Sequence, residues 1–254
     1  MRDILEALAS GDLTPEQAEA KLQGYVTSEA GRFDAARERR SGVPEAILAS
    51  GKTPSEVARL AVTSVETTGR AIATHVDSET LSAIEQALAE DHPDATTAYH
   101  DRASVVVVHA PDFEPPTLDA RVGVVTAGTS DAVPAGEATV IASEMGATVE
   151  RVDDVGVAAL TRLTDRLSEL REFDVLVVAA GREGALPTVA AGLVDVPVIG
   201  LPVSTGYGHG GDGEAALSGM LQSCTALTVV NIDAGFTAGV QAGLIARQLD
   251  AARS

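Results

Sequence analysis

Five glycine-containing stretches in the second half of the chain carry side chains suited to binding a nucleotide. Glycine permits positive φ and a close backbone approach, and the amides that open a helix attract anions. Serine and threonine hydroxyls donate to phosphate, and arginine offers a bidentate fork. A carboxylate among these groups repels phosphate unless a divalent cation lies between them. The stretches are residues 126–131 (TAGTSD), 154–156 (DVG), 180–187 (AGREGALP), 201–211 (LPVSTGYGHGG) and 231–235 (NIDAG).

A simpler interpretation of these stretches is that Gly, Ser and Asp form ordinary turns and helix N-caps. For a single loop that interpretation is the better one, whereas five such loops in succession favour a nucleotide site. The chain contains no Walker sequence, and its only G-x-G-x-x-G matches fall in residues 206–213, in the long stretch after the fourth expected strand and not at the first strand-to-helix turn, so neither a standard hydride-transfer site nor a P-loop is indicated.

Cys224 is the only cysteine, which excludes an intramolecular disulfide and a cysteine-based metal cluster. A lone cysteine is most often a small buried hydrophobe. Cys224 nevertheless closes the helix expected after the long glycine stretch and lies just before residues 229–233 (VVNID). A neighbouring cation or a bound substrate is needed to activate its thiol. His209 is the one histidine in a candidate stretch, and for it a solvent-exposed loop position is as good an interpretation as a role.

The candidate stretches follow short β-branched runs of the kind found in a parallel sheet covered on both faces. Helical segments of about 10 to 16 residues, typical crossover lengths, separate these runs. We therefore expect an α/β fold with an open, doubly wound parallel sheet, whose ligand lies at the carboxyl ends of the strands. The expected strands are Val122–Val125, Thr148–Val152, Val175–Ala179, Val196–Gly200 and Leu227–Val230, with Ser104–His109 as an added edge strand. The expected helices are Ala135–Met145, Val157–Leu170, Leu186–Leu193, Glu214–Gln222 and Phe236–Leu249.

The first part of the chain predicts a small, mainly helical module over residues 1–110. Thr14-Pro15 and Thr53-Pro54 each combine an N-cap with proline at the first helical position, and a further helix is expected over Ser78–Glu90. The Pro-rich segment at residues 110–119 cannot continue a helix or a central strand, so it is interpreted as a connection. The α/β domain is then expected over residues 119–254.

Composition narrows the class of protein. Acidic residues outnumber basic ones 37 to 18 in 254 residues, and the net charge is −19. Such a surface repels nucleic acid and anionic membranes, so neither is an expected partner. The acidic, Lys-poor composition is typical of proteins that work in high salt, where the Debye length falls to about 3 Å at 1 M. No apolar run approaches the ~20 residues that cross a bilayer, and the first residues are no signal peptide. A soluble, cytoplasmic protein is expected.

Several stretches closely resemble the LarB family of nickel-pincer cofactor biosynthesis, which contains a domain similar to the aminoimidazole ribonucleotide (AIR) carboxylase PurE. They are VVTAGTSD at 124–131, DVGVAAL at 154–160, the run from Val177 to Gly208, MLQSC at 220–224 and VVNID at 229–233. In the first module, RRSGVPE at 39–45 and GKT at 51–53 resemble the family's N-terminal signature. The resemblance implies a flavodoxin-type, three-layer AIR carboxylase-like domain and a homo-oligomer, an octamer.

The resemblance also implies a reaction. Nicotinic acid adenine dinucleotide would be carboxylated on its pyridinium ring by carbon dioxide or bicarbonate, and its phosphoanhydride would be hydrolysed. The products would be pyridinium-3,5-biscarboxylic acid mononucleotide and AMP. A pyridinium ring is too electron-poor to attack carbon dioxide, so a thiolate from Cys224 would first add to it and later leave. Mg²⁺ near Glu183 would neutralise charge during anhydride cleavage.

Site residues follow from the resemblance and from the candidate stretches. Cys224, Glu183 and Asp131 are expected to be catalytic, and Glu183 also to bind the metal ion. The residues expected to bind substrate are Gly128, Thr129, Ser130, Asp154, Gly156, Arg162, Gly181, Arg182, Gly184, Ser204, Gly206, Tyr207, Asn231 and Asp233.

The chain departs from the family pattern at two places. Thr161-Arg162 stands where His-Arg is expected, which removes a ligand or proton carrier. Arg182 stands where Met is expected before the family Glu, which adds a cation beside an anionic substrate.

Two alternatives remain. An AIR carboxylase or mutase of purine biosynthesis would need a catalytic His in the second strand-to-helix loop, where this chain has Asp154-Val155-Gly156. A non-catalytic nucleotide-binding protein would fit a buried Cys224.

Overall fold

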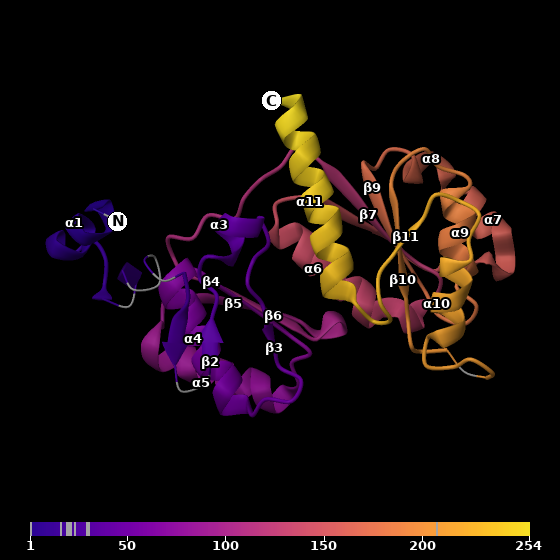
Figure 1. The fold of residues 1–254 in the computed structure, drawn as a ribbon. Helices are drawn as coiled ribbons and strands as arrows, with labels where there is room; N and C mark the ends of the chain where they lie inside the picture. Colours follow the sequence, from indigo (N-terminus) through magenta and orange to yellow (C-terminus); the bar gives the residue numbers. More distant parts are fainter. Residues whose placement is uncertain (1, 16, 19–21, 23, 29–30, 207) are drawn as a thin grey trace. The chain divides into compact units, whose positions relative to one another are not determined.

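The computed structural model describes residues 2–254 except 16, 19–21, 23, 29–30 and 207. The chain forms two compact units, Met1–Glu114 and Pro115–Ser254, and the division falls within the Pro-rich segment (Figure 1). None of the described helices is both long and apolar enough to cross a membrane.

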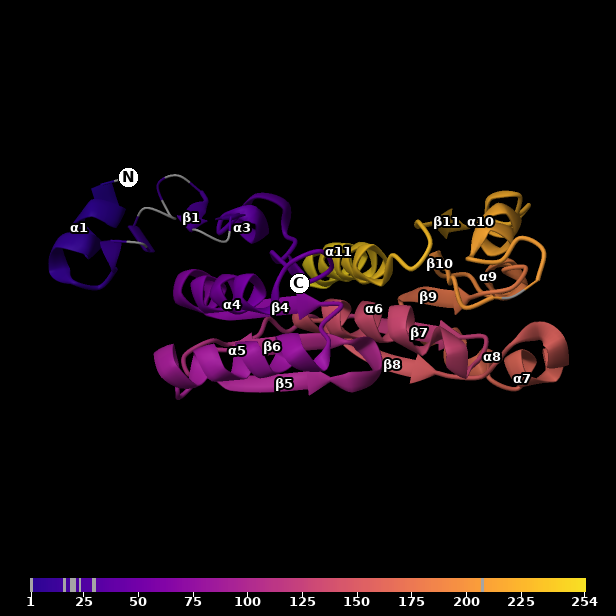
Figure 2. The same cartoon turned by 90° about the horizontal axis from the view of Figure 1, so that it is seen from below.

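The first unit contains a sheet as well as helices. The sheet has the strand order β3-β4-β6-β5, and helices α4 and α5 pack on one of its faces (Figure 2). A separate hairpin joins β1 and β2. The bounds are α1 Arg2–Ser10, β1 Val26–Ser28, β2 Gly31–Phe33, α3 Arg37–Ser41, β3 Ile47–Leu48, α4 Pro54–Thr68, β4 Arg70–Thr74, α5 Ser78–Asp91, β5 Thr96–His100, the 3-10 turn η1 Asp101–Ala103 and β6 Val105–His109.

The structure confirms one expected helix start in this unit and corrects the position of one expected strand. The helix start at Thr53 is confirmed: Thr53 and Glu56 form a capping box, with Pro54 at the first helical position. The edge strand expected over Ser104–His109 is instead β6, an inner strand of the first unit's own sheet. Strand β6 lies between β4 and β5, because β5, whose side chains are exposed, pairs with the side of β6 that faces away from β4.

The second unit is a doubly wound, parallel α/β sheet, and the predicted fold class is confirmed. Its strand order is β11-β10-β9-β7-β8 with every pair parallel, which is the flavodoxin-type order. The strands are β7 Arg121–Thr126, β8 Thr148–Val152, β9 Val175–Ala180, β10 Val198–Pro202 and β11 Thr228–Val229. The helices are α6 Ala132–Glu144, α7 Leu160–Thr164, α8 Leu167–Leu170, α9 Ala185–Ala191, α10 Glu214–Leu221 and α11 Gly235–Arg253, with 3-10 turns η2 Thr129–Asp131 and η3 Val157–Ala159.

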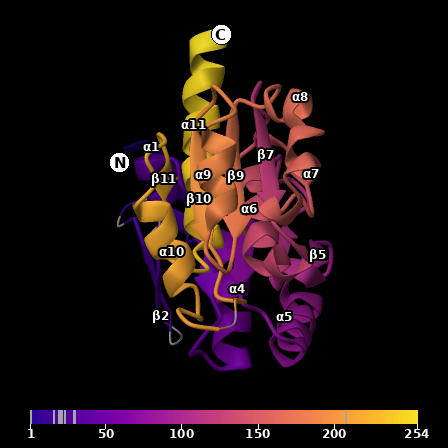
Figure 3. The same cartoon turned by 90° about the vertical axis from the view of Figure 1, so that its right-hand side faces the viewer.

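The side chains of β9 point alternately to the two faces of the sheet, and a layer of helices packs against each face. Val175, Val177 and Ala179 belong to the core beneath α6 and α11. The intervening residues of β9 belong to the core on the opposite face, with residues of α7 to α10. Figure 3 shows α9 in front of the sheet and α11 behind it. Because both faces are covered, β9 is apolar along its whole length.

Two expected elements differ in detail. The helix expected over Val157–Leu170 is divided into η3, α7 and α8. The break falls at Arg166, whose backbone leaves the helical region at φ −102° and ψ 4°, while its guanidinium binds Glu169. Strand β10 begins two residues later than expected, because the apolar run continues to Val203 and does not mark the strand's ends.

Candidate functional site

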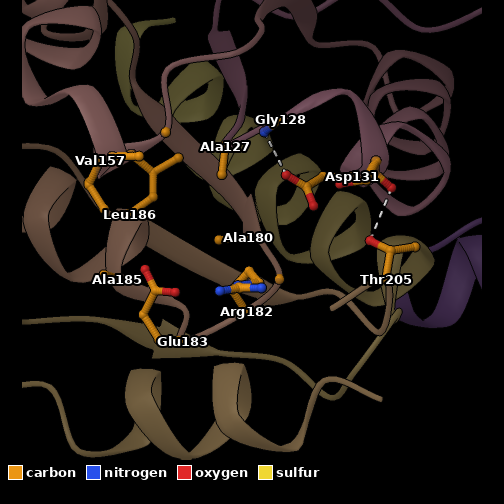
Figure 4. A pocket seen from close by; sticks show the side chains of 14 residues that line it. Ala127, Gly128, Asp131, Val157, Ala180, Arg182, Glu183, Ala185, Leu186 and Thr205 are labelled. Atoms are coloured by element: carbon orange, nitrogen blue, oxygen red, sulfur yellow. Dashed lines mark hydrogen bonds between the residues drawn. The ribbon is translucent and has the colours of Figure 1, made fainter. Parts of the chain in front are cut away.

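A cavity of about 340 Å³, here called the switch-point cavity, opens at the carboxyl ends of the strands of the second unit. It lies where the loops after β7, β8 and β9 meet (Figure 4). These loops flank the topological switch point of the sheet, since β8 lies on one side of β7 and the later strands lie on the other. Its lining residues are Ala127, Gly128, Ser130, Asp131, Gly156, Val157, Ala158, Ala180, Gly181, Arg182, Glu183, Ala185, Leu186 and Thr205.

Asp131 is a buried carboxylate in this cavity, with 2% of its surface exposed. Its Oδ2 accepts a hydrogen bond from the Gly128 backbone amide at 2.8 Å (Figure 4). Burial raises the pKa of the Asp131 carboxyl, while hydrogen bonds from neighbouring backbone amides and from Ser130 oppose that change. A carboxylate with a raised pKa is better suited to accept a proton near neutral pH.

We expect Asp131→Asn to change how stability depends on pH. The raised pKa means that the folded protein binds this proton more tightly than the unfolded chain does. The free energy of unfolding of the wild type therefore falls as pH rises from about 4 through the folded pKa. Asp131→Asn lacks this contribution, so its stability relative to the wild type should improve across that window in urea titrations. A constant difference between the two proteins at all pH values would contradict the assignment.

Arg182 and Glu183 follow β9, and both side chains are exposed at the mouth of the switch-point cavity. Arg182 adopts a left-handed backbone at φ 49°. Gly206, from the loop after β10, comes so close that a Cβ there would lie 3.0 Å from the Arg182 amide nitrogen. The two loops are thus packed against each other, which holds a cation and a carboxylate side by side at the mouth.

Gly184 is the N-cap residue of helix α9 and follows this pair directly. Its φ is +65°, and a Cβ would lie 2.5 Å from the Ala216 carbonyl oxygen of α10. We expect Gly184→Ala to lower the free energy of unfolding by about 3 kcal/mol, because it combines a left-handed backbone with a backbone clash. Gly208→Ala is the matched control, since Gly208 also has positive φ but nothing lies within 4 Å of its Cβ position. Denaturant unfolding that found the two variants equally stable would contradict this packing.

A second cavity of about 330 Å³, here called the glycine-loop cavity, lies beside the first. Arg182 and Glu183 line both cavities. The remaining lining residues come from the loop after β10 and the start of α10: Gly206, Gly208, His209, Gly210, Gly211 and Ala215.

The cavities bring together only part of the predicted site. Eight of the expected site residues line at least one of the two cavities: Gly128, Ser130, Asp131, Gly156, Gly181, Arg182, Glu183 and Gly206. Thr129, Gly184, Ser204, Asn231 and Asp233 lie in the neighbouring loops but line neither cavity. Tyr207 lies outside the described residues.

Some of the remaining residues connect loops instead. Asp233 accepts a hydrogen bond from the Ser204 amide at 2.9 Å, which ties the loop after β11 to the loop after β10. Asp154 pairs with Arg162 at 3.1 Å on an exposed surface, and neither lines a cavity. Arg162 is therefore engaged by a carboxylate of its own chain.

Cys224 is exposed but lines neither cavity. Helix α10 starts beside the glycine-loop cavity and carries the chain back towards the amino ends of the strands, over eight residues or about 12 Å. Beside the cysteine, Thr225 donates a hydrogen bond to the Thr188 carbonyl and packs near Gly192, at the far end of α9. Within one chain, the thiol thus lies at the opposite edge of the sheet from the cavities.

Thr205 is a lining residue that the sequence analysis did not single out. Its hydroxyl donates to the Ser130 carbonyl at 3.2 Å, so it links the loops after β7 and β10 (Figure 4). Gly208, Gly210 and Gly211 line the glycine-loop cavity and are also not among the expected site residues. The high glycine content of residues 206–211 was the signal available for them.

The described residues contain no group of three or more His, Cys, Asp or Glu side chains placed to hold a metal ion. Magnesium commonly binds through one or two carboxylates together with substrate phosphates and waters. An exposed carboxylate at a cavity mouth, such as Glu183, fits that mode of binding.

Comparisons with known proteins match both units. The model of the LarB/PurE-like N-terminal domain matches residues 25–110, and that of AIR carboxylase matches residues 121–254. The uncharacterized protein MJ0165 of Methanocaldococcus jannaschii is 38% identical over an alignment of 254 positions that covers 97% of each chain. A flavodoxin structure from the domain Archaea aligns with 51% of this chain and 98% of its own, at 15% identity and a TM-score of 0.31.

Proposed function

Since this chain belongs to the LarB family, with an AIR carboxylase domain after a LarB/PurE-like N-terminal domain, we propose that it carboxylates the pyridinium ring of nicotinic acid adenine dinucleotide and hydrolyses the phosphoanhydride. A carboxylase-type activity follows from the AIR carboxylase domain itself. The observation that carries the finer proposal is the switch-point cavity, which combines Ser130 and Asp131 with Arg182 and Glu183.

The thiolate of Cys224 would supply the electrons that the ring lacks. Its addition to the ring carbon between the two positions that finally bear carboxylates gives a dihydropyridine with a nucleophilic enamine carbon. That carbon attacks carbon dioxide, loses its proton to a base, and the ring nitrogen then expels the thiolate. The pyridinium is restored without any oxidant, and the net reaction adds CO₂ and releases one proton.

We assign the base to Asp131. Its carboxylate lines the switch-point cavity, and burial raises its pKa. Val157 and Leu186 give the same cavity an apolar wall, which suits one face of a flat ring. The hydroxyl of Ser130 supplies a hydrogen-bond donor for a carboxylate or phosphate.

The thiol must come from a second copy of the chain, because Cys224 lies at the opposite edge of its own sheet. Exposed apolar side chains near both regions support this arrangement. Leu221 is 66% exposed close to the cysteine, and Val133 and Leu160 are 46% and 50% exposed at the starts of α6 and α7, beside the cavity loops. Homo-oligomer interfaces bury such side chains. We therefore propose a homo-oligomer, an octamer, in which neighbouring chains share each site.

Glu183 is the residue that would hold a magnesium ion during cleavage of the anhydride. When bound, it would stabilise the negative charge that develops as the anhydride is cleaved. Glu183 would hold the ion at the mouth of the cavity, and Arg182 would pair with a phosphate oxygen. Water attacks one phosphorus of the anhydride, and the two products each leave with a phosphomonoester.

The direct test incubates the purified protein with the dinucleotide, ¹³C-bicarbonate and Mg²⁺ in molar KCl. We expect a dicarboxylated pyridinium mononucleotide, heavier by one ¹³C carboxylate, together with AMP in equal amount. Incubation with AIR serves as the parallel assay for the alternative function. Conversion of AIR without conversion of the dinucleotide would contradict the proposal and favour the purine reaction. The structure offers the purine reaction little support, because no histidine is among the described residues that line the switch-point cavity.

A further inference from the structure

The glycine-loop cavity differs in chemistry from the switch-point cavity. Four glycines line it with their backbone, and among the described lining residues Ala215 alone has an apolar side chain. Its cationic or ionisable donors are Arg182 and His209, and Glu183 is its carboxylate. Backbone amides with a guanidinium and an imidazole are groups that recognise phosphate and sugar hydroxyls.

Hydrogen-bond donors in this loop are unused within the described part of the chain. The amides of Gly208, His209 and Gly210 donate to no described residue, and neither does the His209 imidazole. Gly208 and Gly210 have φ of +97° and +70°, and successive amides that alternate in this way form concavities for anions. Other amides of the segment are already hydrogen-bonded: the Gly211 amide donates to the Gly208 carbonyl, and the Ala215 amide donates to the Gly210 carbonyl.

The two cavities meet at Arg182 and Glu183, which line both. We propose that the glycine-loop cavity is the subsite for the nucleoside 5′-phosphate half of the dinucleotide, with His209 as a phosphate ligand. This inference rests on the proposed function and assigns the pyridinium half to the switch-point cavity. The anhydride then lies against Arg182 and Glu183, between the two halves. Asp212 and Glu214, the nearest carboxylates along the loop, do not line the cavity.

The test measures the binding of AMP and of nicotinic acid mononucleotide separately, by calorimetry in KCl of fixed concentration. His209→Ala should weaken AMP binding about 10-fold, the scale of one charge-assisted hydrogen bond, and leave mononucleotide binding unchanged. His209→Asp should weaken AMP binding further through repulsion. Ser130→Ala should show the opposite selectivity. His100→Ala, an exposed histidine of the other unit, is the matched control.

The outcomes separate this inference from the proposed function. AMP affinity that is unchanged in both His209 variants would overturn the subsite, as would a wild type that binds no AMP. Equal weakening of both nucleotides by Ser130→Ala would place them in one cavity and also overturn it. A wild type that binds AMP through His209 but carboxylates no dinucleotide would support the phosphate subsite while contradicting the proposed reaction.

Discussion

Cys224→Ser is expected to abolish carboxylation of the dinucleotide, with a loss of at least about 10³-fold in product formation. A serine hydroxyl is hardly ionised near neutral pH and cannot supply electrons to the ring as a thiolate does. The protein should remain folded, because the cysteine is exposed and its sulfur fills no core. Mass spectrometry of the products and a thermal melt of the variant check the two halves of this prediction.

The neighbouring Ser223 provides a control for Cys224→Ser. Ser223→Ala removes a small side chain from the same turn and should retain most of the activity, although it loses two hydrogen bonds with Thr225. Alkylation of wild-type Cys224 by iodoacetamide should also inactivate the enzyme, and bound dinucleotide should protect it. Product formation by Cys224→Ser at a rate close to that of the wild type would contradict covalent catalysis by this thiol.

Glu183→Gln is expected to slow the release of AMP by about 10²-fold at fixed Mg²⁺, because the amide cannot bind the cation as a carboxylate does. The dependence on Mg²⁺ should shift to higher concentrations. Ring carboxylation should be affected less than anhydride cleavage, so carboxylated dinucleotide should accumulate. Quenched time courses that separate the two products measure both steps.

Glu85→Gln is the matched control for Glu183→Gln. It removes the same charge from an exposed position on α5, in the other unit. It should leave both steps unchanged, which separates a local effect from one of net charge. AMP release by Glu183→Gln with an unaltered Mg²⁺ dependence would remove Glu183 from the metal site.

The α/β fold could be predicted because its strands are continuous apolar runs. Val175–Ala180 is buried on both faces, and the five expected strands from Val122 onwards each overlap an observed strand of this sheet, whereas the added edge strand at Ser104–His109 belongs to the other unit. The sheet of the first unit was missed for a physical reason. Strand β5 has exposed side chains, and β3 is only two residues long, so neither carries the apolar pattern of a buried strand.

The position of the cavity could be predicted as well, because parallel strands end at one edge of a sheet. This rule brings the loops of Asp131, Gly156 and Arg182 together from three separate parts of the chain. The sequence could not show which residues in these loops face the cavity. Asp154 and Asp233 carry suitable side chains, yet their hydrogen bonds join them to Arg162 and to the Ser204 amide.

The location of Cys224 shows a second limit of the sequence. The short sequence distance between Cys224 and the fifth candidate loop predicts that the thiol lies near the site. Strand β11 separates the cysteine from that loop, and a parallel strand carries the chain from one edge of the sheet to the other. Sequence distance alone therefore could not reveal that a second chain is needed to complete the proposed site.

Mixing of inactive subunits tests the shared site most directly. Cys224→Ser and Asp131→Asn chains, which are both defective in carboxylation, are co-expressed in equal amounts, so each carries one intact component of that step. If neighbouring chains share each site, random assembly of the oligomer unites an intact cavity with an intact thiol in about a quarter of the sites. We predict that the mixture recovers about a quarter of wild-type formation of the dicarboxylated mononucleotide. A mixture no more active than the two separate variants would contradict the account.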